Sequence, residues 1–193
     1  MHRRQIKSLL EEKMKHIGVF LSARDNLDPH YTCLTREVGQ WIGKTGRTLV
    51  YGGSRCGLME VLAQATKQAG GTVWGVVPHI ITERQLESPC MDRKFPCKDL
   101  NERKQILMEQ SDIILALPGG IGTLDEIFTI LGVSAIGLPG AKTVVLYNAD
   151  GSWDKLIELL DELHAKHFLR DSYCERLKVA SSVEELEVFC QNK

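Results

Sequence analysis

The chain has 193 residues, a length typical of one domain. Its 24 Lys and Arg residues nearly balance 25 Asp and Glu residues, which gives a formal net charge of −1. This balance excludes a strongly basic nucleic-acid binder, and the 43% hydrophobic content excludes a disordered chain. No stretch approaches the roughly 18 apolar residues of a transmembrane helix, so we expect no membrane partner.

Short apolar runs alternate with helical patterns along the chain. Residues 1–15 lack the apolar core of a secretory signal, and we expect a helical extension on a cytoplasmic protein. The expected strands are 16–21, 48–51, 72–77, 112–117, 142–147 and 177–180. The expected helices are 29–44, 58–69, 100–110, 123–135, 153–167 and 183–190. Residues 81–99 contain two prolines and mixed polarity, which predicts an irregular loop.

The expected strands are continuous apolar runs, as in parallel strands that are buried on both faces. Strand–helix alternation predicts an α/β fold, a Rossmann-like doubly wound parallel sheet with helices on both faces. No internal repeat or linker interrupts the pattern, so residues 16–193 are expected to form a single domain. Ligands of such sheets bind beyond the carboxyl ends of the strands. The loops to inspect follow Leu21, Tyr51, Val77, Leu117 and Tyr147.

The six cysteines form no Cys-x-x-Cys pair, and the chain is long enough to fold without disulfides. A metal site or a reactive thiol is one interpretation of them. We expect instead reduced, mostly buried thiols in a cytoplasmic protein. No His or Cys residues cluster at metal-ligand spacing, so we expect no metal and no cofactor.

The loop after Leu117 is the most informative segment, with the sequence Pro-Gly-Gly-Ile-Gly-Thr at 118–123. Glycines let a ligand approach the backbone amides, and the helix that follows offers free N–H groups and the positive end of its dipole. The loop matches neither the Walker motif nor the Gly-x-Gly-x-x-Gly pattern. We expect a phosphate site here, and the alternative is a tight turn without a ligand.

Three further features leave alternatives open. Glu126 lies on the first turn of an expected helix, where it either complements the helix dipole or acts as a catalytic carboxylate. Residues 52–57 form a second glycine-rich turn, which suggests a ligand whose two ends are held at neighbouring helix N-termini. Arg103 belongs to the charged run 101–104, which is either a solvated face or the location of an anion clamp.

Together these segments resemble the LOG family of cytokinin riboside 5′-monophosphate phosphoribohydrolases, whose members are often mislabelled as lysine decarboxylases. The resemblance covers roughly residues 16–190 and rests on 52–59, on Glu-Arg-Lys at 102–104 and on 111–126. The family's marks, Pro-Gly-Gly-x-Gly-Thr-x-x-Glu and a preceding Arg-Lys pair, are both present. The resemblance implies a Rossmann-like homodimer whose active site lies near the dimer interface. It also implies hydrolysis of the N-glycosidic bond of a nucleoside 5′-monophosphate to free base and ribose 5-phosphate.

The resemblance implies roles for individual residues. Glu126 would be the catalytic carboxylate and Arg103 the catalytic arginine. The substrate- and phosphate-binding residues would be Gly53, Met59, Arg103, Lys104, Gly119, Gly120, Gly122 and Thr123. The chemistry is consistent, because cleavage of an N-glycoside builds positive charge on the ribose, which a carboxylate stabilises while it activates water.

The chain departs from the family pattern mainly near the base. Leu-Ser-Ala-Arg at 21–24, which includes Ser22, stands where the family usually has Cys-Gly-Ser-Ser. Glu60 replaces a glycine, Gln85 a glutamate and Gly132 a threonine. The phosphate and catalytic parts are kept, so nucleotide hydrolysis is implied more strongly than a cytokinin substrate. We expect AMP or an N6-modified AMP as substrate, such as a cytokinin riboside monophosphate.

Two alternatives accompany this interpretation. One is a general purine-nucleotide nucleosidase without a hormone role. The other is a non-catalytic nucleotide or molybdenum-cofactor carrier of the same superfamily. Glu126 and Arg103 favour an enzyme, because a pure binder has less use for a carboxylate near an anion. Amino-acid decarboxylation is excluded, because the sequence shows no recognisable setting for a Schiff-base lysine.

Overall fold

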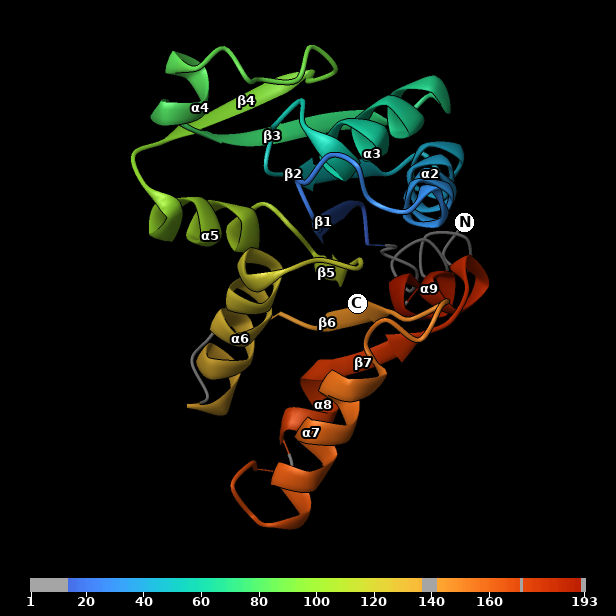
Figure 1. The fold of residues 1–193 in the computed structure, drawn as a ribbon, viewed down its shortest axis with the longest axis vertical. Helices are drawn as coiled ribbons and strands as arrows, with labels where there is room; N and C mark the ends of the chain where they lie inside the picture. Colours follow the sequence, from blue (N-terminus) through green and yellow to red (C-terminus); the bar gives the residue numbers. More distant parts are fainter. Residues whose placement is uncertain (1–13, 137–141, 171, 192–193) are drawn as a thin grey trace, which may run out of the picture.

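The structure, a computed structural model, describes residues 14–136, 142–170 and 172–191. Residues 1–13 of the expected N-terminal extension lie outside the described residues. The described strands are parallel and form one seven-stranded sheet in the order β4-β3-β2-β1-β5-β6-β7 (Figure 1). The strands are β1 (His16–Phe20), β2 (Thr48–Tyr51), β3 (Thr72–Pro78), β4 (Arg93–Cys97), β5 (Ile113–Ala116), β6 (Val144–Tyr147) and β7 (Leu177–Ala180).

Helices cover both faces of this sheet, which confirms the predicted fold class. The helices are α2 (Pro29–Lys44), α3 (Gly57–Gln68), α4 (His79–Glu83), α5 (Leu100–Glu109), α6 (Ile121–Ala135), α7 (Asp154–Ala165), α8 (Ser172–Arg176) and α9 (Val183–Cys190). One apolar layer joins the sheet to α2, α3 and α9, and a second joins it to α5, α6 and α7. In β2, Leu49 and Tyr51 enter the first layer and Val50 enters the second. The continuous apolar runs of the sequence therefore reflect burial on both faces.

The segment 81–99 is the main error of the secondary-structure prediction. It contains β4, and α4 begins just before it, where an irregular loop was expected. β4 is an edge strand that contains two exposed charged residues and an exposed proline, so it lacks the apolar pattern of the central strands. An aromatic contact joins β4 to β3, because the ring centroids of Phe95 and Trp74 lie 5.6 Å apart. The short helix α8 was also missed.

The cysteines also differ from the prediction. Only Cys97 and Cys190 are buried, Cys33 and Cys174 are exposed, and the other two are intermediate, so "mostly buried" is wrong. All six are free thiols. Among the described residues, no group of three or more His, Cys, Asp or Glu side chains could hold a metal ion. No helix in the described ranges is long and apolar enough to cross a membrane.

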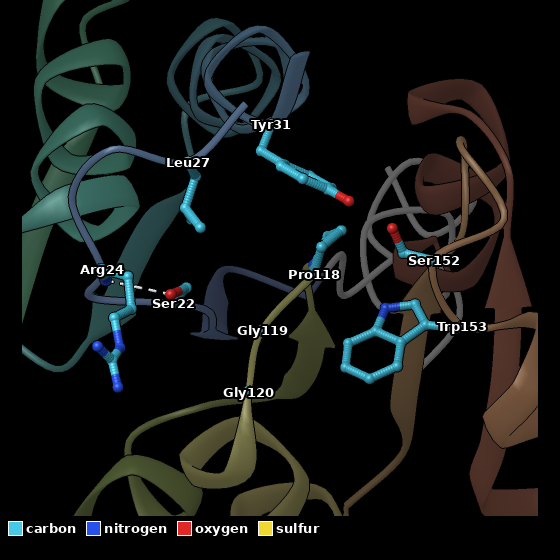
Figure 2. Close-up of a pocket in the computed structure, with 9 residues that line it drawn as sticks. All are labelled: Ser22, Arg24, Leu27, Tyr31, Pro118, Gly119, Gly120, Ser152 and Trp153. Carbon is cyan, nitrogen blue, oxygen red and sulfur yellow. Dashed lines mark hydrogen bonds between the residues drawn. The ribbon is translucent and has the colours of Figure 1, made fainter. Parts of the chain in front are cut away.

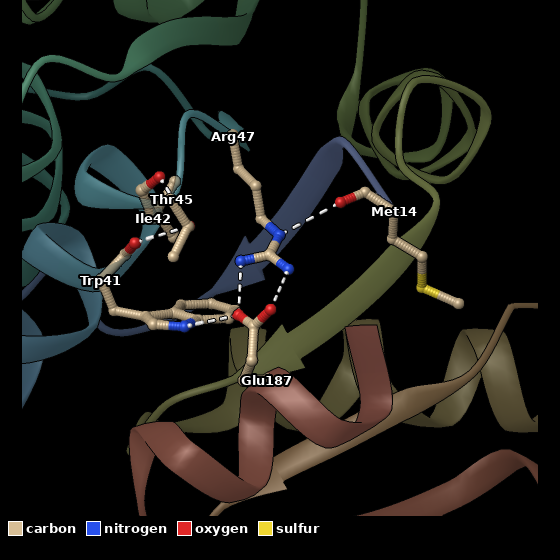
Figure 3. Close-up of polar contacts among 6 residues, drawn as sticks. All are labelled: Met14, Trp41, Ile42, Thr45, Arg47 and Glu187. Atoms are coloured by element: carbon tan, nitrogen blue, oxygen red, sulfur yellow. Dashed lines mark hydrogen bonds and ion pairs between the residues drawn. The ribbon is translucent and has the colours of Figure 1, made fainter. Parts of the chain in front are cut away.

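A partly buried ion pair holds the C-terminal helix α9 against the amino ends of the strands (Figure 3). Arg47 is 4% exposed, and its two Nη atoms donate to the Glu187 carboxylate at 2.6 and 2.9 Å. Its Nε atom donates to the Met14 carbonyl oxygen at 3.1 Å. The Trp41 indole N–H donates to the same carboxylate at 3.1 Å, so α2 joins the network as well.

The strand order places a switch point between β1 and β5. The chain runs from β1 through β2 and β3 to β4 on one side, and from β5 through β6 to β7 on the other. At the centre Val19 pairs with Leu115, so the loops after β1 and β5 leave the same edge side by side. Loops that diverge at a switch point leave a crevice at the carboxyl ends of the strands.

Candidate active site

A cavity of about 590 Å³ occupies the crevice at the switch point. Its walls come from the loop after β1, the first turn of α3, one residue of α5 and the first turns of α6. The lining residues are Leu21, Ser22, Ala23, Arg24, Met59, Arg103, Gly120, Ile121, Gly122, Thr123 and Glu126. This volume is typical of small-molecule sites, which span roughly 300–1,000 Å³. The structure therefore brings most of the expected site residues together around one space.

The N-terminus of α6 forms one wall of this cavity and has no side-chain cap. Asp28 caps α2 and Asp99 caps α5, each accepting a backbone N–H, whereas Gly120 at the start of α6 offers no side chain. The first N–H groups of α6 have no partner within the helix. A Cβ atom at Gly120 or Gly122 would meet nothing within 4 Å, so the glycines leave the amides open to a ligand.

Gly119 has a structural reason to be glycine. A Cβ atom there would lie 2.1 Å from Thr123 Oγ1. Thr123 belongs to the first turn of α6 and is 3% exposed. The glycine therefore lets the loop fold tightly over the first turn of α6. Glycines in the Pro-Gly-Gly-Ile-Gly-Thr segment serve both purposes, the tight turn and open access to the backbone.

Arg103 points toward the carboxyl edge of the sheet, so it is not part of a solvated face of α5. Its Nε atom donates to the Val76 carbonyl oxygen at 3.3 Å, and Nη2 donates to the Gly52 carbonyl oxygen at 3.0 Å. A Cβ atom at Gly52 would lie 1.6 Å from Nη2, so only glycine leaves room for the guanidinium. Two carbonyl groups thus fix this positive charge in the cavity wall.

Glu126 lies in the same wall, one turn into α6. Burial raises the pKa of this carboxyl to about 7, although the positive charge of Arg103 acts to lower it. The negative charge of Asp125 raises the pKa further, and Lys104 lowers it. A carboxyl that titrates near neutrality can accept or donate a proton under physiological conditions. Its burial in a cleft beside a fixed cation is typical of a functional carboxyl rather than a helix-dipole partner.

Besides Gly119, two of the expected binding residues do not line this cavity. Lys104 Nζ donates to both carboxylate oxygens of Asp125, at 3.1 and 2.9 Å, and to Thr129 Oγ1 at 3.1 Å. Lys104 is therefore directed along α6 and is not among the residues that line the cavity. Gly53 does not line it either, because it packs against Val77 with a φ of +70°.

The second glycine-rich turn does not offer a free anion site at its helix. The carboxylate of Asp25 accepts the Gly57 N–H at 2.9 Å, so the first amide of α3 already has an anionic partner. A Cβ atom at Gly57 would lie 2.2 Å from the Arg24 carbonyl oxygen. The loop after β1 is therefore pressed against the start of α3. The idea of a ligand held at both helix N-termini is not supported by this arrangement.

A second cavity of about 360 Å³ adjoins the first on the side of β6 (Figure 2). The two share Ser22, Arg24 and Gly120. Its other walls come from Leu27 and Tyr31 near the start of α2, Pro118 and Gly119 after β5, and Ser152 and Trp153 before α7. Figure 2 shows the rings of Tyr31 and Trp153 on either side of Pro118.

Apart from Gly119 and Gly120, the residues that line this second cavity were assigned no role from the sequence. The available signal was their position, because the loops after Leu21 and Tyr147 were among those expected at the ligand edge. Of the departures from the family pattern, only the segment 21–24 lines a cavity at this edge. Glu60 instead accepts hydrogen bonds from Gln64 at 3.0 Å and from the Cys90 thiol at 3.7 Å. Gln85 and Gly132 line neither cavity.

Comparison with known proteins identifies relatives of this chain. The family model described as "Possible lysine decarboxylase" matches residues 59–188. A cytokinin riboside 5′-monophosphate phosphoribohydrolase of Rhodococcoides fascians is 32% identical over 88% of this chain and 86% of its own length. Another from Arabidopsis thaliana is 28% identical over 92% of this chain and 78% of its own length.

Solved structures with the same fold include molybdenum-cofactor proteins. The molybdenum cofactor binding protein of Rippkaea orientalis is 27% identical, with a TM-score of 0.68 over 92% of this chain and 96% of its own. The molybdenum cofactor carrier protein of Chlamydomonas reinhardtii is 23% identical, with a TM-score of 0.67 over 91% and 94%. The match to the family model and the curated relatives together show that the chain belongs to the LOG family.

Proposed function

We propose that this chain hydrolyses the N-glycosidic bond of a nucleoside 5′-monophosphate to free base and ribose 5-phosphate. AMP or an N6-modified AMP, such as a cytokinin riboside monophosphate, is the proposed substrate. The proposal depends on one observation. A half-buried carboxyl with a raised pKa, Glu126, shares a cavity with the fixed guanidinium of Arg103 and the uncapped N-terminus of α6. The names of the curated relatives support the same reaction class.

The proposed mechanism follows from these positions. The 5′-phosphate binds the amides at the start of α6, which holds the ribose over Glu126. As the bond between C1′ and the base nitrogen breaks, its electron pair leaves with the base, which takes up a proton from solvent; the proton that Glu126 later accepts from water returns to solvent. The ionised Glu126 carboxylate stabilises the positive charge that develops on the ribose. A water molecule adds to C1′, and Glu126 accepts its proton.

Arg103 contributes in two ways to this proposal. Its fixed positive charge opposes the effect of burial on the Glu126 pKa, so a usable fraction of the carboxyl stays ionised near neutrality. A guanidinium held by two carbonyl oxygens also keeps unused N–H donors for the substrate. We assign these donors to substrate oxygens near the scissile bond.

A homodimer is the proposed assembly. An apolar cavity of about 360 Å³ lies between α6, α7 and α8. Large apolar side chains beside it are exposed, among them Phe168 at 75% and Ile136 at 68%. Exposed apolar patches of this kind mark interaction surfaces. Phe168→Glu is expected to lower the dimer fraction in sedimentation velocity, and an unchanged distribution would contradict this face.

The free thiols support a cytoplasmic location.

Incubation with a panel of nucleotides tests the reaction. Free base and ribose 5-phosphate are separated by chromatography and must appear in equal amounts. Glu126→Gln is the matched control, because it keeps the side-chain size and removes the proton acceptor. Equal base release by wild type and Glu126→Gln would overturn the assignment of this carboxyl.

A non-catalytic carrier is the second candidate function. It is favoured by the likeness to the Rippkaea orientalis molybdenum cofactor binding protein, at 27% identity and a TM-score of 0.68. A carrier would bind nucleotides without releasing free base. Titration calorimetry with AMP, followed by chromatography of the same sample, separates the two functions.

A further inference from the structure

The two cavities at the carboxyl edge adjoin, and the residues that line both of them can bind an anion. Ser22, Arg24 and Gly120 belong to both linings. The Ser22 hydroxyl oxygen accepts the Arg24 N–H at 3.1 Å, so its O–H remains available to donate. Gly120 starts the uncapped helix α6. A hydroxyl, a guanidinium and open helix amides together favour an anion at the junction.

The position of Arg24 is fixed through its backbone. Its carbonyl oxygen packs against Gly57, where a Cβ atom would intrude to 2.2 Å. The next residue, Asp25, accepts the Gly57 N–H at 2.9 Å. The loop therefore fixes the Arg24 backbone beside both cavities, and Figure 2 shows the Arg24 side chain at the edge of the smaller one.

The compartments on either side of this junction differ in chemistry. The larger one contains Glu126 and Arg103, the groups that the proposed reaction uses. The smaller one has aromatic and apolar walls from Leu27, Tyr31, Pro118 and Trp153, and among the described residues the shared Arg24 is its only charged lining residue. The Trp153 indole is held rigidly, because its N–H donates to the Ala116 carbonyl oxygen at 3.1 Å. Rigid aromatic walls without charge suit a planar ring.

We propose that the site accepts nucleotides whose 5′-phosphate carries a second, planar group, linked as a phosphodiester or through a pyrophosphate. This inference rests on the proposed function. The nucleoside would occupy the Glu126 compartment, the bridging phosphate the junction, and the planar group the smaller cavity that Leu27, Tyr31, Pro118 and Trp153 line. A plain monophosphate fills only the first compartment and the junction. The reaction is unchanged, since the bond from C1′ to the base breaks and the phosphate ester bonds stay intact.

Two esters of AMP with equal charge test this inference. The phenyl ester and the methyl ester carry the same diester phosphate, and only the phenyl ester has a ring. Wild-type kcat/KM for adenine release is expected to be at least about 10-fold higher for the phenyl ester, an order of magnitude typical of stacking on aromatic side chains. Equal values for the two esters would overturn the inference.

Tyr31 variants identify the compartment. Tyr31→Ala is expected to reduce the phenyl-to-methyl ratio to near one, whereas Tyr31→Phe keeps the ring and is expected to keep the ratio. Val188→Ala, on an exposed position of α9, is a remote control that should not change it. A Tyr31→Ala enzyme that retains the full preference would show that the ring binds elsewhere and would overturn the assignment.

The two proposals can fail separately. Binding of both esters to Glu126→Gln, measured by calorimetry, needs no turnover. If wild type releases no base but the phenyl ester still binds at least about 10-fold more tightly than the methyl ester, only the hydrolase proposal fails. If wild type cleaves AMP but both esters bind equally, only the two-compartment inference fails.

Discussion

The Arg103 guanidinium lies so close to Gly52 that a side chain at position 52 would displace it. The guanidinium donates to the Gly52 carbonyl oxygen at 3.0 Å, and the space for a Gly52 Cβ atom is filled by Nη2. The two residues lie on α5 and on the loop after β2, which are 51 positions apart in the chain. Long-range fixation of this kind preorganises a charge before the substrate arrives.

Gly52→Ala is expected to lower kcat/KM by displacing Arg103. Arg103→Ala is expected to weaken both binding and turnover, because hydrogen bonds to charged groups contribute about 1.5–3 kcal/mol each. The measurement is a double-mutant cycle on nucleotide hydrolysis. If Gly52→Ala acts through Arg103, it should cause little further loss in the Arg103→Ala background. Additive losses would show that the alanine methyl disturbs the site by another route.

Some features of this fold could be read directly from the sequence, because the central strands are buried on both faces. Ile17, Val50 and Leu115 are each 0% exposed, and their continuous apolar runs are the strongest pattern in the chain. The edge strand β4 could not be predicted, because its residues are mainly exposed and its pairing with β3 uses backbone groups. Secondary structure that depends on tertiary pairing leaves little periodic signal in its own residues.

The candidate site also contains features that the sequence predicts and features that it does not. The glycine loop and Glu126 follow one another in the chain, so their meeting at one helix start could be predicted. The inward direction of Arg103 depends on Val76 and Gly52, which only the folded sheet brings near it. Lys104, its neighbour in sequence, is directed instead to Asp125. Side-chain direction on a helix cannot be decided from a charged run alone.

Glu126→Gln is expected to abolish turnover while nucleotide affinity stays within a few-fold. The amides of α6 bind the phosphate, and the carboxylate acts on the ribose, so the two roles are separate. Wild-type kcat/KM should rise with pH around an apparent pKa of about 7, because only the ionised carboxylate accepts the proton. A flat pH profile, or near-normal turnover in the variant, would remove Glu126 from catalysis.

The same substitution is expected to stabilise the protein at high pH. Burial raises the folded-state pKa of Glu126 from 4.5 to about 7, so the unfolded chain ionises first as the pH rises. The free energy of unfolding therefore falls by about 2 kcal/mol as the pH rises from 4.5 to about 7. Urea unfolding should show Glu126→Gln more stable than wild type at about pH 8 and nearly equal at about pH 4. An equal difference at both pH values would exclude this titration as the cause.

Arg47→Met is expected to destabilise the fold by about 3 kcal/mol, because it leaves the Glu187 carboxylate without its cationic partner. The Arg47 guanidinium holds the pKa of Glu187 below its usual range, so this stability is present near neutral pH and is lost as the pH falls through the folded-state pKa. Urea unfolding measures the loss. Adding Glu187→Leu should restore part of it, and a larger loss in the double variant would contradict a simple ion pair.

Adenosine is expected to be hydrolysed at least about 100-fold less efficiently than AMP. The net charge of −1 provides no general positive field, so recognition of the phosphate falls to the start of α6 and the arginines beside it. Loss of the phosphate removes orientation as well as affinity, so turnover should fall together with binding. The factor corresponds to about 2.7 kcal/mol of lost transition-state stabilisation. Steady-state kcat/KM for the two compounds, measured from adenine release, gives the ratio. Comparable values would mean that the loop at 118–123 is a structural turn, and that the phosphate plays no part in recognition by this cavity.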